Sequence, residues 1–507
     1  MSTLDPNLLS ELILPSLRSD PKTSFQKQIY KALQQAILSG ALGAGHRLPS
    51  TRQLALELGV SRITVTLAYD KLSAEGYIAT AKGSGTFVAD THPLIHRELT
   101  VAHSQVRDLD ECGLSTRAKR LVRSTHGGSQ QSGAFVPGIS DTLHFPFHLW
   151  QRMQNRYTKK PHSALTGYGT GGGYAPLRRA LAEYLQISRS VKCTPEQIII
   201  TMGTNQSLDL CALMLADAQD VALIEEPCNW STALIWRAAD LQVKTLGLDE
   251  DGLRLQDFPF AETHASEHPK LVFTTPSHQY PMGGAMSLQR RRLLIELARR
   301  YNFWIIEDDY DSEFRYDTNP LPSLQGLDHH ERVIYLGTFS KVMYPGLRMS
   351  YLVVPQSLAQ SFASGLNQLF RPGQLSLQAA MSDFITEGYF ASHVRRMRGI
   401  YAERQRELKR SLDSHFGDVI HTSGGNAGLH LTTRFHNPVD INRMTTFCDS
   451  RGVALRDLAL YYQGKSPMPG YVLGYGGIAT EQVDAAVQIM AEGYDLALQE
   501  ARYHMAT

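Results

Sequence analysis

The sequence predicts a multidomain chain, with a small α+β head followed by a large α/β body. In residues 21–90, helical patterns separated by a glycine precede two short β-like runs around further glycines. From about residue 133 onward, short apolar runs alternate with amphipathic helical patterns, as in QIIIT before GTNQSLDLCALML. Such alternation predicts a largely parallel sheet covered by helices on both faces. A length of 507 residues fits two or three domains.

Composition sets limits on the class of protein. The chain is 42% hydrophobic and 20% charged, and no apolar run approaches the roughly 20 residues of a membrane helix. The first residues lack the basic start of a signal peptide. The five cysteines are scattered without metal-type spacing, which suits a reducing compartment and argues against disulfides. We therefore expect a cytoplasmic protein with no membrane segment and no metal site.

The head begins with a helix. Ile29, Leu33 and Ile37 lie four residues apart, which places them on one helical stripe, and Gly40 ends the pattern. Residues 21–89 carry eight Lys/Arg and three Asp/Glu, which gives this segment a net charge of +5. A basic head is compatible with nucleic-acid binding, although many solvated protein faces are equally basic.

A short helix, a glycine turn and a second helix follow. In LPSTRQLALELGVS, Ser50 or Thr51 can cap the short helix, since a side-chain oxygen there accepts from a free N–H of the first turn. Gly59 makes the turn, and Ser61 caps the next helix. This order is the helix-turn-helix arrangement.

The second helix of this pair has the features of a recognition helix. Arg62, Thr64, Thr66 and Tyr69 lie off its buried stripe, near the helix N-terminus, where such side chains meet base edges and phosphates. GYIATAKGSGTFVA then predicts two strands joined by a glycine-rich wing that includes Gly83. From the residues alone, a small packing domain with an exposed hairpin remains an alternative.

The stretch GALGAGHRLPSTRQLALELGVSRITVTLAYDKLSAEGYIATAKGSGTFVA is similar to the winged-helix domain of GntR-type bacterial regulators along essentially its whole length. The pattern G-x-R-L-P-S-x-R-x-L-A followed by G-V-S-R-x-T-V carries the resemblance. It implies a winged helix-turn-helix that contacts double-stranded operator DNA. The expected DNA-binding residues are Arg47, Ser50, Thr51, Arg52, Ser61, Arg62, Thr64, Thr66, Tyr69 and Gly83.

Residues 91–132 predict a linker between the domain at 21–90 and the domain at 133–507. Their periodicity is weak, and they mix charges, serines, glycines and histidines, with room for one short helix. An extended chain spans about 3.3 Å per residue, so the linker could reach across tens of ångströms. The head could therefore lie on a neighbouring subunit.

The stretch GTFSKVMYPGLRMSYLVVP follows a strand-like run and contains a candidate nucleophile, Lys341. An exposed lysine, with a pKa near ~10.4, is a poor nucleophile. At the end of a buried strand, Lys341 could be partly desolvated and suited to forming a Schiff base. The hydroxyls of Thr338 and Ser340 and the guanidinium of Arg348 would suit a phosphate group. Taken alone, a lysine after a strand is more often an ordinary surface residue.

Two further strand ends carry candidate binding residues. EDDY closes the strand FWIIEDDY, and the buried carboxylate of Asp308 would need a cationic partner such as a pyridinium nitrogen. Tyr310 lies on the same side of the extended segment. In TMGTNQSL, a strand and a glycine lead into a helix whose N-terminus could hold an anion at Gly203, Thr204 and Asn205. Each of these signals is weak alone, because acidic loops and glycine turns are common.

In order, GTNQSL, TPSHQYPMGG, EDDY and TFSKVMYPGLR resemble the fold-type I pyridoxal 5′-phosphate (PLP) enzymes of the aminotransferase family, over roughly residues 135–496. The earlier YGTGGGYAPLRRALAEYL is similar to that family's Y-G-x-x-x-G-x-x-x-L-R segment. The resemblance implies PLP as cofactor, with Lys341 forming the internal aldimine, Asp308 at the pyridine nitrogen and Tyr310 at the 3′-oxygen. It also implies phosphate contacts from Arg348 and Thr338. Tyr168 is expected to reach the phosphate of a neighbouring subunit.

The sequence departs from the family pattern at three places. Tyr280 stands where simple aminotransferases have the Asn of N-P-x-G. Asn229 stands where many relatives have a ring-stacking tyrosine, which leaves Trp230 as the candidate for stacking. GYVLGYGGIA lacks the substrate-binding arginine of a late strand, and Arg456, or less directly Arg434, could replace it. The expected cofactor site consists of Lys341, Asp308, Tyr310, Thr338, Ser340, Arg348, Gly203, Thr204, Asn205, Tyr168, Tyr280 and Trp230.

The two halves in this order resemble the MocR subgroup of GntR regulators, in which an aminotransferase-like domain serves as an effector sensor. The leading hypothesis is a transcription regulator that uses PLP to sense an amine or amino acid, or that senses PLP itself. A working aminotransferase with an accessory DNA-binding head is the alternative, and a pure dimerisation scaffold is a third. The family implies a homodimer, and the linker would allow a head-to-tail dimer with exchanged heads. Whether transamination is turned over stays open.

Overall fold

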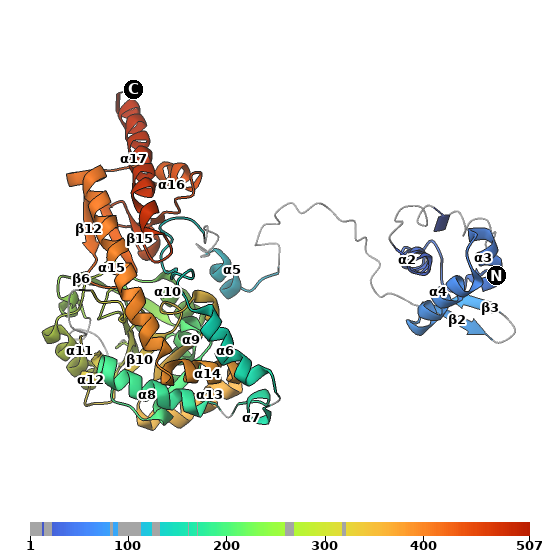
Figure 1. Ribbon diagram of the computed structural model, residues 1–507, viewed down its shortest axis with the longest axis horizontal. Coiled ribbons are helices and arrows are strands. Elements are labelled where there is room, and N and C mark those ends of the chain that lie inside the picture. Colours follow the sequence, from blue (N-terminus) through green and yellow to red (C-terminus); the bar gives the residue numbers. More distant parts are fainter. Residues whose placement is uncertain are drawn as a thin grey trace. The chain divides into compact units, whose positions relative to one another are not determined.

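The computed structural model divides the chain into two compact units, residues 1–108 and residues 109–507 (Figure 1). No helix in the described part of the chain is long and apolar enough to cross a membrane. The structure describes residues 13–14, 23–81, 85–89, 113–123, 132–160, 162–169, 171–258, 268–316 and 321–506, with side chains up to residue 498.

The first unit contains the predicted helices: α2 (Phe25–Leu38), α3 (Thr51–Leu58) and α4 (Arg62–Ala74). Ser50 is the N-cap of α3, its side-chain oxygen accepting from the Gln53 N–H at 3.2 Å. The predicted helix-turn-helix is therefore present, and Gly59 forms its turn with a left-handed φ of 66°, a conformation that glycine adopts without strain. The core of the unit is formed by Ile29, Leu33, Leu54, Val65, Ala68 and Leu72, with further apolar side chains.

The structure corrects the prediction for Tyr69. This side chain is only 5% exposed, and its hydroxyl donates to the Pro49 carbonyl at 3.0 Å. Val65 and Tyr69 are four residues apart, so both face the core of the unit, and Tyr69 cannot present its ring to DNA. In contrast, Arg62 is exposed on the same helix.

A three-stranded antiparallel sheet completes the first unit, with strand order β1-β3-β2. Its strands are β1 (Arg47–Leu48), β2 (Ile78–Ala81) and β3 (Gly85–Val88). A Cβ at residue 85 would lie 2.9 Å from Nε of Arg47, so glycine lets this guanidinium lie against the hairpin. Gly83, expected to contact DNA, lies outside the described residues.

The second unit is built on an eight-stranded sheet with strand order β4-β11-β10-β9-β8-β5-β6-β7. From β10 to β6 the strands are parallel, whereas β11, β4 and β7 pair antiparallel with their neighbours. The predicted, largely parallel sheet is thereby confirmed. The strands are β4 (Ile198–Thr201), β5 (Val221–Glu226), β6 (Gln242–Asp249), β7 (Gly252–Leu253), β8 (Leu271–Thr274), β9 (Trp304–Asp308), β10 (Val333–Thr338) and β11 (Ser350–Val353).

Helices cover both faces of this sheet because its strands are apolar on both sides. In β4, Ile198 and Ile200 belong to one hydrophobic cluster, packed with α8, α14 and α15, while Ile199 belongs to another, packed with α9, α10 and α13. A third cluster packs α11 on the sheet. The helices are α6 (Phe147–Thr158), α7 (Ser163–Thr166), α8 (Ala175–Arg189), α9 (Thr204–Leu215), α10 (Trp230–Ala238), α11 (Leu288–Tyr301), α12 (Leu324–Leu327), α13 (Ala359–Phe370), α14 (Leu375–Thr386) and α15 (Tyr389–Phe416).

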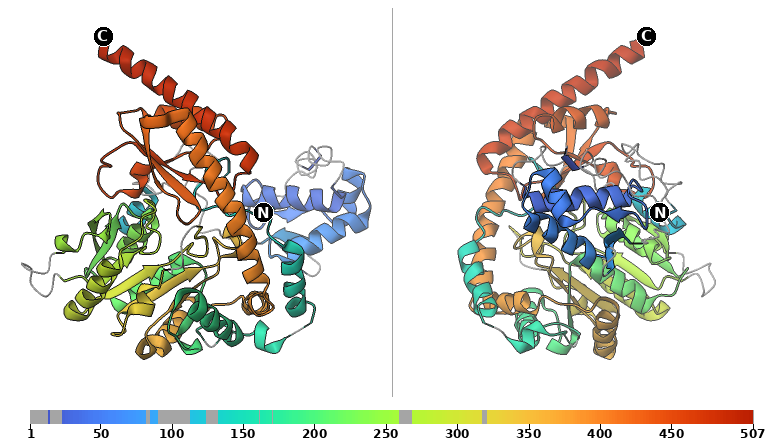
Figure 2. Two further views of the ribbon diagram at one scale, coloured as in Figure 1. Left: turned by 60° about the vertical axis from the view of Figure 1, so that its left-hand side comes forward. Right: turned by 90° about the vertical axis from the view of Figure 1, so that its right-hand side faces the viewer.

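A smaller layer follows at the C-terminal side of the unit. The long helix α15 leads to a four-stranded antiparallel sheet of order β12-β13-β15-β14, which packs with α16 and α17 (Figure 2). This sheet carries both arginines that were considered as effector ligands. The elements are β12 (Ile420–Gly424), β13 (His430–Phe435), α16 (Ile441–Asp449), β14 (Arg456–Asp457), β15 (Gly470–Gly474) and α17 (Val483–Ala506).

Part of the expected linker belongs to the second unit. A short helix, α5 (Thr116–Arg123), contacts α10. Together with the segment at residues 459–463, these helices line a cavity of about 680 Å³ that includes Arg117, Leu121 and Trp230. The connection between the head and the sheet is therefore held against the body at α5.

Candidate functional site

The candidate site lies where β4, β8, β9 and β10 end. Lys341 follows β10, and its Nζ donates to the Gly138 carbonyl at 2.9 Å. Burial lowers the pKa of Lys341, and the carboxylates of Asp311 and Asp308 act in the opposite direction. A Cβ at residue 138 would lie 2.6 Å from this Nζ, so the glycine leaves room for the lysine. The predicted nucleophile is thus partly desolvated, as its chemistry requires.

Asp308 is the last residue of β9 and is only 7% exposed. Among the described residues, its Oδ1 has no hydrogen-bond partner. Burial, reinforced by Asp309 and Asp311, raises the pKa of Asp308 to about 8. In the described part of the chain, its Oδ1 thus lacks a hydrogen-bonding partner, and the charge of Lys341 does not offset the burial. This site is therefore built to receive such a partner from a ligand.

Tyr310 lies beside Asp308 and contacts a residue to which the sequence gave no role. Its hydroxyl lies 2.9 Å from Nδ1 of His278, and the same nitrogen lies 3.1 Å from both carboxylate oxygens of Asp311. His278 is part of the quoted stretch TPSHQYP, but nothing in the sequence pairs it with Asp311. The structure brings them together because β8 and β9 are adjacent strands.

A second buried histidine packs on this group. The rings of His430 and His278 are 4.9 Å apart, and Nε2 of His430 lies 2.9 Å from the Pro281 carbonyl oxygen. Potential ligand atoms of His278, Asp311 and His430 lie within 4.8 Å of one another, as in a metal site. Since His278 Nδ1 and His430 Nε2 are both engaged with protein oxygens, we interpret the group as a hydrogen-bonded cluster beside the cleft.

The start of α9 is a candidate anion-binding site. Gly203 is the N-cap of this helix with φ 101°, and no side chain caps the helix in the part of the chain that the structure describes. A Cβ at residue 203 would lie 2.6 Å from Nη2 of Arg348, so glycine allows the guanidinium to approach the helix N-terminus. Thr204 and Asn205 form the first turn of α9. Positive charge and free N–H groups at a helix start favour an anion.

Hydroxyl groups complete this side of the site. Thr338 Oγ1 accepts from the Ser340 N–H at 3.2 Å and from the Ser350 hydroxyl at 2.8 Å. Thr201 and Ser207 pair through their hydroxyls at 2.7 Å. Ser350, Thr201 and Ser207 had not been predicted as site residues, because a single hydroxyl residue gives no distinct signal in a sequence.

An aromatic chain closes another side of the site. The rings of Trp230 and Tyr461 lie 5.6 Å apart, those of Tyr461 and Tyr280 5.4 Å, and those of Tyr280 and Tyr310 5.6 Å. The hydroxyls of Tyr280 and Tyr461 are 3.2 Å apart. Asn229 instead caps α10, its Oδ1 accepting from the Ser231 N–H at 3.0 Å. Tyr461, which the sequence did not single out, therefore joins Trp230 to Tyr280.

The two candidate effector arginines lie at different places. Arg456 on β14 is directly opposite Val472 on β15, within the strand where the sequence lacks the family's arginine. It is 6% exposed, and its charge counters the burial that raises the pKa of Tyr461 to about 12. Arg434 lines a separate cavity of about 710 Å³ at the ends of β5 and β6, together with Glu225. Only Arg456 thus joins the aromatic side of the site.

Tyr168 lies apart from these groups. Its side chain is 85% exposed, and the guanidinium of Arg371 lies 5.8 Å from its ring centre. It follows α7 on the surface of the unit, beside residues 371–375. An exposed tyrosine is available to a second copy of the chain, as the resemblance predicts.

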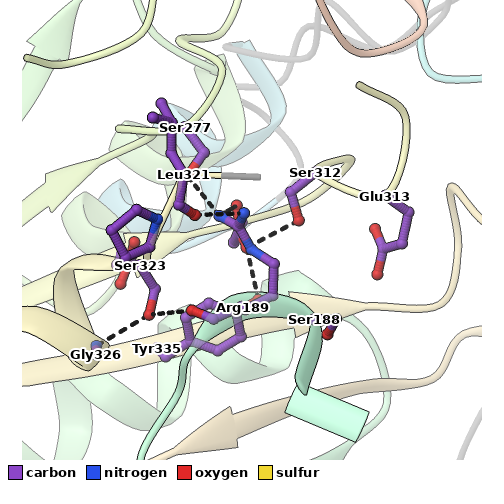
Figure 3. Close-up of polar contacts among 12 residues, drawn as sticks. Ser188, Arg189, Ser277, Ser312, Glu313, Leu321, Ser323, Gly326 and Tyr335 are labelled. Atoms are coloured by element: carbon purple, nitrogen blue, oxygen red, sulfur yellow. Dashed lines mark hydrogen bonds and ion pairs between the residues drawn. The ribbon is translucent and has the colours of Figure 1, made fainter. Parts of the chain in front are cut away.

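A buried ion pair fixes the segments that carry the site (Figure 3). Arg189, at the end of α8, donates to Asp309 from Nε at 2.6 Å and from Nη2 at 3.0 Å, and to the Ser277 hydroxyl at 2.7 Å. The hydroxyls of Tyr335 and Ser312 also donate to Asp309. Although burial acts against it, Arg189 holds the pKa of Asp309 below its usual value. The ion pair therefore ties the EDDY segment to the segment that carries His278.

Both halves of the chain match known protein families. Residues 25–88 match the family "Bacterial regulatory proteins, gntR family", and residues 140–460 match "Aminotransferase class I and II". The probable rhizopine catabolism regulatory protein MocR of Rhizobium meliloti is 37% identical over 96% of both chains. This chain belongs to the MocR group of GntR-type transcriptional regulators.

Two further comparisons agree with this assignment. The pyridoxine biosynthesis transcriptional regulator PdxR of Corynebacterium glutamicum is 32% identical over 91% of this chain and 94% of its own. The kynurenine aminotransferase of Pyrococcus horikoshii superposes with a TM-score of 0.66 at 23% identity, covering 76% of this chain and 95% of that one. The latter shows the fold alone. The predicted winged-helix and aminotransferase folds are confirmed, and regulation is favoured over an aminotransferase with an accessory head.

The class I and II aminotransferase domain implies PLP dependence, and the residues present fit that group. The unpartnered Oδ1 of Asp308 suits a protonated pyridine nitrogen. The open N-terminus of α9 beside Arg348 suits a phosphate, and Lys341 lies close enough to Asp308 for the two charges to interact. The GntR match likewise implies DNA binding by the head.

Proposed function

We propose that this regulator binds PLP in its body, senses an amine, an amino acid or PLP itself there, and thereby alters operator binding by its head. The observation that carries this proposal is the buried Asp308 near Lys341, whose Oδ1 has no hydrogen-bond partner among the described residues. A regulator that used its body only as a scaffold would have no reason to keep a buried carboxylate without a partner. PLP, when bound, supplies an aldehyde for a lysine and a ring that acts as an electron sink.

The residues of the cleft divide the binding task. Lys341 is the covalent attachment point, because its lowered pKa leaves more of the amine neutral. Asp308 pairs with the ring nitrogen, and Tyr310 faces the 3′-oxygen. The phosphate is held by Arg348 and by the start of α9. The hydroxyl groups and α9 residues proposed for that contact are Thr338, Ser340, Gly203, Thr204 and Asn205.

The effector is proposed to be an amine that carries a carboxylate, held by Arg456. Arg456 is buried, and its Cα pairs with that of Val472 on β15. It therefore lies beside the late strand and takes the place of the arginine that this strand lacks. Tyr280 and Trp230 line the path between Arg456 and the cofactor residues through Tyr461. PLP alone as the signal is the other form of the proposal, and Arg456 would then have no part in the response.

The head is proposed to bind operator DNA through α3 and α4. Arg47, Arg52 and Arg62 are all exposed, and Arg62 Nε lies 3.4 Å from the Thr51 hydroxyl. The side-chain oxygens of Ser50 and Ser61 each accept from one N–H group in the first turn of α3 and α4. The other N–H groups of these first turns can then meet phosphates. Thr64 and Thr66 are half-buried near the start of α4. We propose a cytoplasmic homodimer, in which Tyr168 completes the neighbouring site.

The contact of α5 with α10 offers a route between the two functions. Trp230 is the first residue of α10 and also lines the cavity beside α5. A change at the aromatic chain would therefore reach the connection to the head. We expect Leu121→Asp, which places a charge in this cavity, to reduce the effector response of operator binding while the absorption of bound PLP stays unchanged. An unchanged response would exclude this route.

The proposal is tested by absorption spectroscopy combined with operator titration. Purified protein loaded with PLP should show a visible band that is lost in Lys341→Ala and weakened in Asp308→Asn, with Asp257→Asn, an exposed carboxylate, as the matched control. Operator titrations with and without PLP and candidate amino acids then measure the response. Absence of any PLP uptake by the wild type would refute the proposal. Turnover of a keto acid would instead support the aminotransferase alternative.

A further inference from the structure

The buried group of Asp311, His278 and Tyr310 has a geometry that decides where one proton lies. His278 is 3% exposed and Asp311 is 2% exposed. Nδ1 of His278 faces three oxygens, the two of the Asp311 carboxylate at 3.1 Å and the Tyr310 hydroxyl at 2.9 Å. A ring nitrogen carries either one hydrogen or one lone pair, so it cannot donate to Asp311 and also accept from Tyr310.

The carboxylate settles this choice. A charge-assisted hydrogen bond from N–H to a carboxylate is about twice as strong as a neutral one, and a buried carboxylate facing a lone pair would be repelled. Nδ1 of His278 therefore carries the hydrogen and donates to Asp311. The Tyr310 hydroxyl then has no acceptor at His278, and its proton must point elsewhere.

The surroundings protect this arrangement. Burial, with His278 adding to it, holds the pKa of His430 well below its usual value, so His430 stays neutral and does not compete for Asp311. A Cβ at residue 428 would lie 2.0 Å from Cε1 of His278 and 2.4 Å from Oδ2 of Asp311. Gly428, at φ 77°, therefore packs its backbone directly on the pair.

The other titratable groups around Tyr310 favour its neutral form. Burial raises the pKa of Tyr310 well above its usual value, and Asp311, Tyr280, Asp308 and Glu225 act in the same direction. The phenol therefore keeps its proton. With His278 unable to accept it, the open direction is the cleft beside Asp308.

We infer that Asp311 and His278 are positioning residues that aim the Tyr310 hydroxyl proton into the cleft, toward the 3′-oxygen of PLP. This inference rests on the proposed function for the identity of the acceptor. The direction of the proton itself rests on the protein alone.

The first experiment uses PLP-loaded full-length protein and measures the pH midpoint of the visible band. Tyr310→Phe removes the donated hydrogen bond and should move the midpoint up by about one pH unit or more, since bonds to a charged oxygen are strong. Asp311→Asn should move it similarly, because a neutral amide no longer fixes the hydrogen on Nδ1 by a charge-assisted bond. An Nδ1 without a hydrogen can then accept from Tyr310. The double variant should shift no further than Tyr310→Phe alone.

Two results of this experiment would overturn the inference. An unshifted midpoint in Asp311→Asn, or a double variant whose shift is the sum of the single shifts, overturns the inference. A merely structural defect would change the melting temperature and the operator affinity without reproducing the Tyr310→Phe shift. Asp257→Asn is the control carboxylate, expected to leave the midpoint unchanged.

The second experiment needs no cofactor. Nitrogen-15 NMR of histidine-labelled protein without PLP, with His278 assigned from the spectrum of His278→Gln, reports which ring nitrogen carries the hydrogen. The expected result is Nδ1–H in the wild type and Nε2–H in Asp311→Asn. A wild type with Nε2–H overturns the inference even where PLP binds. A wild type that takes up no PLP but shows Nδ1–H refutes the proposed function and supports the proton direction.

Discussion

Replacing Arg189 by methionine is expected to destabilise the body more than any surface substitution. Arg189 and Asp309 have side chains that are 3% and 1% exposed, and the guanidinium makes two hydrogen bonds to the carboxylate. Further bonds run to the Ser277 hydroxyl and to the Leu321 carbonyl, the latter at 2.8 Å. Methionine keeps much of the apolar volume and removes all of these contacts.

The magnitude follows from what the substitution leaves behind. Asp309 would keep only the hydroxyls of Tyr335 and Ser312 as partners for a buried charge. Breaking a buried ion pair by removing one partner costs about 3–5 kcal/mol in the free energy of unfolding. The double variant Arg189→Met with Asp309→Asn should lose less than Arg189→Met alone, because no unpaired charge remains.

The assay can report on the body alone. All four tryptophans lie between residues 150 and 304, so their fluorescence during urea unfolding follows the second unit and not the head. Arg299→Met is the matched control, since its ion pair with Glu296 is about half exposed on both sides and such pairs contribute little. A loss in Arg189→Met no larger than that in Arg299→Met would refute the reasoning.

The same substitution has a defined pH dependence. Arg189 lowers the pKa of Asp309 in the folded protein relative to its usual 3.8, so the wild-type pair stabilises the fold above that value and less as pH falls through the folded pKa. Without Arg189, burial raises the pKa of Asp309, and protonation then favours the folded state. The difference in unfolding free energy between wild type and Arg189→Met should therefore narrow as pH falls from 7 toward 4.

Four other substitutions test the proposed sites. Lys341→Ala should abolish the visible PLP band and the effector response in operator titrations. Its operator affinity without effector should stay within a few-fold of wild type, because the head folds as a separate unit. A Lys341→Ala protein that responds to the effector as wild type does would exclude covalent sensing. Arg62→Ala should weaken operator binding by about 1–3 kcal/mol if Arg62 contacts a base, whereas Arg52→Ala should weaken binding to all DNA sequences and flatten the salt dependence of binding. Gel-shift titrations at two salt concentrations distinguish these two effects, and unchanged affinity in both variants would contradict the proposed DNA interface. Arg456→Met should reduce the response to a carboxylate-bearing amine at least tenfold and leave the response to PLP unchanged. Arg434→Met is the control, and equal effects of both variants would refute Arg456 as the residue that binds the effector carboxylate.

Much of this protein could be predicted because its signals are local in the sequence. The spacing of Ile29, Leu33 and Ile37, the cap at Ser50 and the turn at Gly59 are set within one or two helical turns. The strand ends that carry Lys341 and Asp308 follow from the alternation of apolar runs and helices, since parallel strands bring their carboxyl ends to one edge. The same local rule places Tyr69 on the buried stripe of α4 with Val65, four residues earlier, so the prediction that Tyr69 contacts DNA was wrong.

Only the tertiary structure decided the groups that depend on pairs of distant residues. Asp311 and His278 are 33 positions apart, Arg189 and Asp309 are 120 apart, and Tyr280 and Tyr461 are 181 apart. Arg456 was the first effector candidate from the sequence, and the pairing of β14 with β15 places it beside the late strand. A sequence fixes which chemical groups are present and which local elements form, but the partner of a buried charge depends on which strands and helices become neighbours. Packing across the whole sheet decides which elements become neighbours, and it thereby determines which polar side chains of this site bind one another.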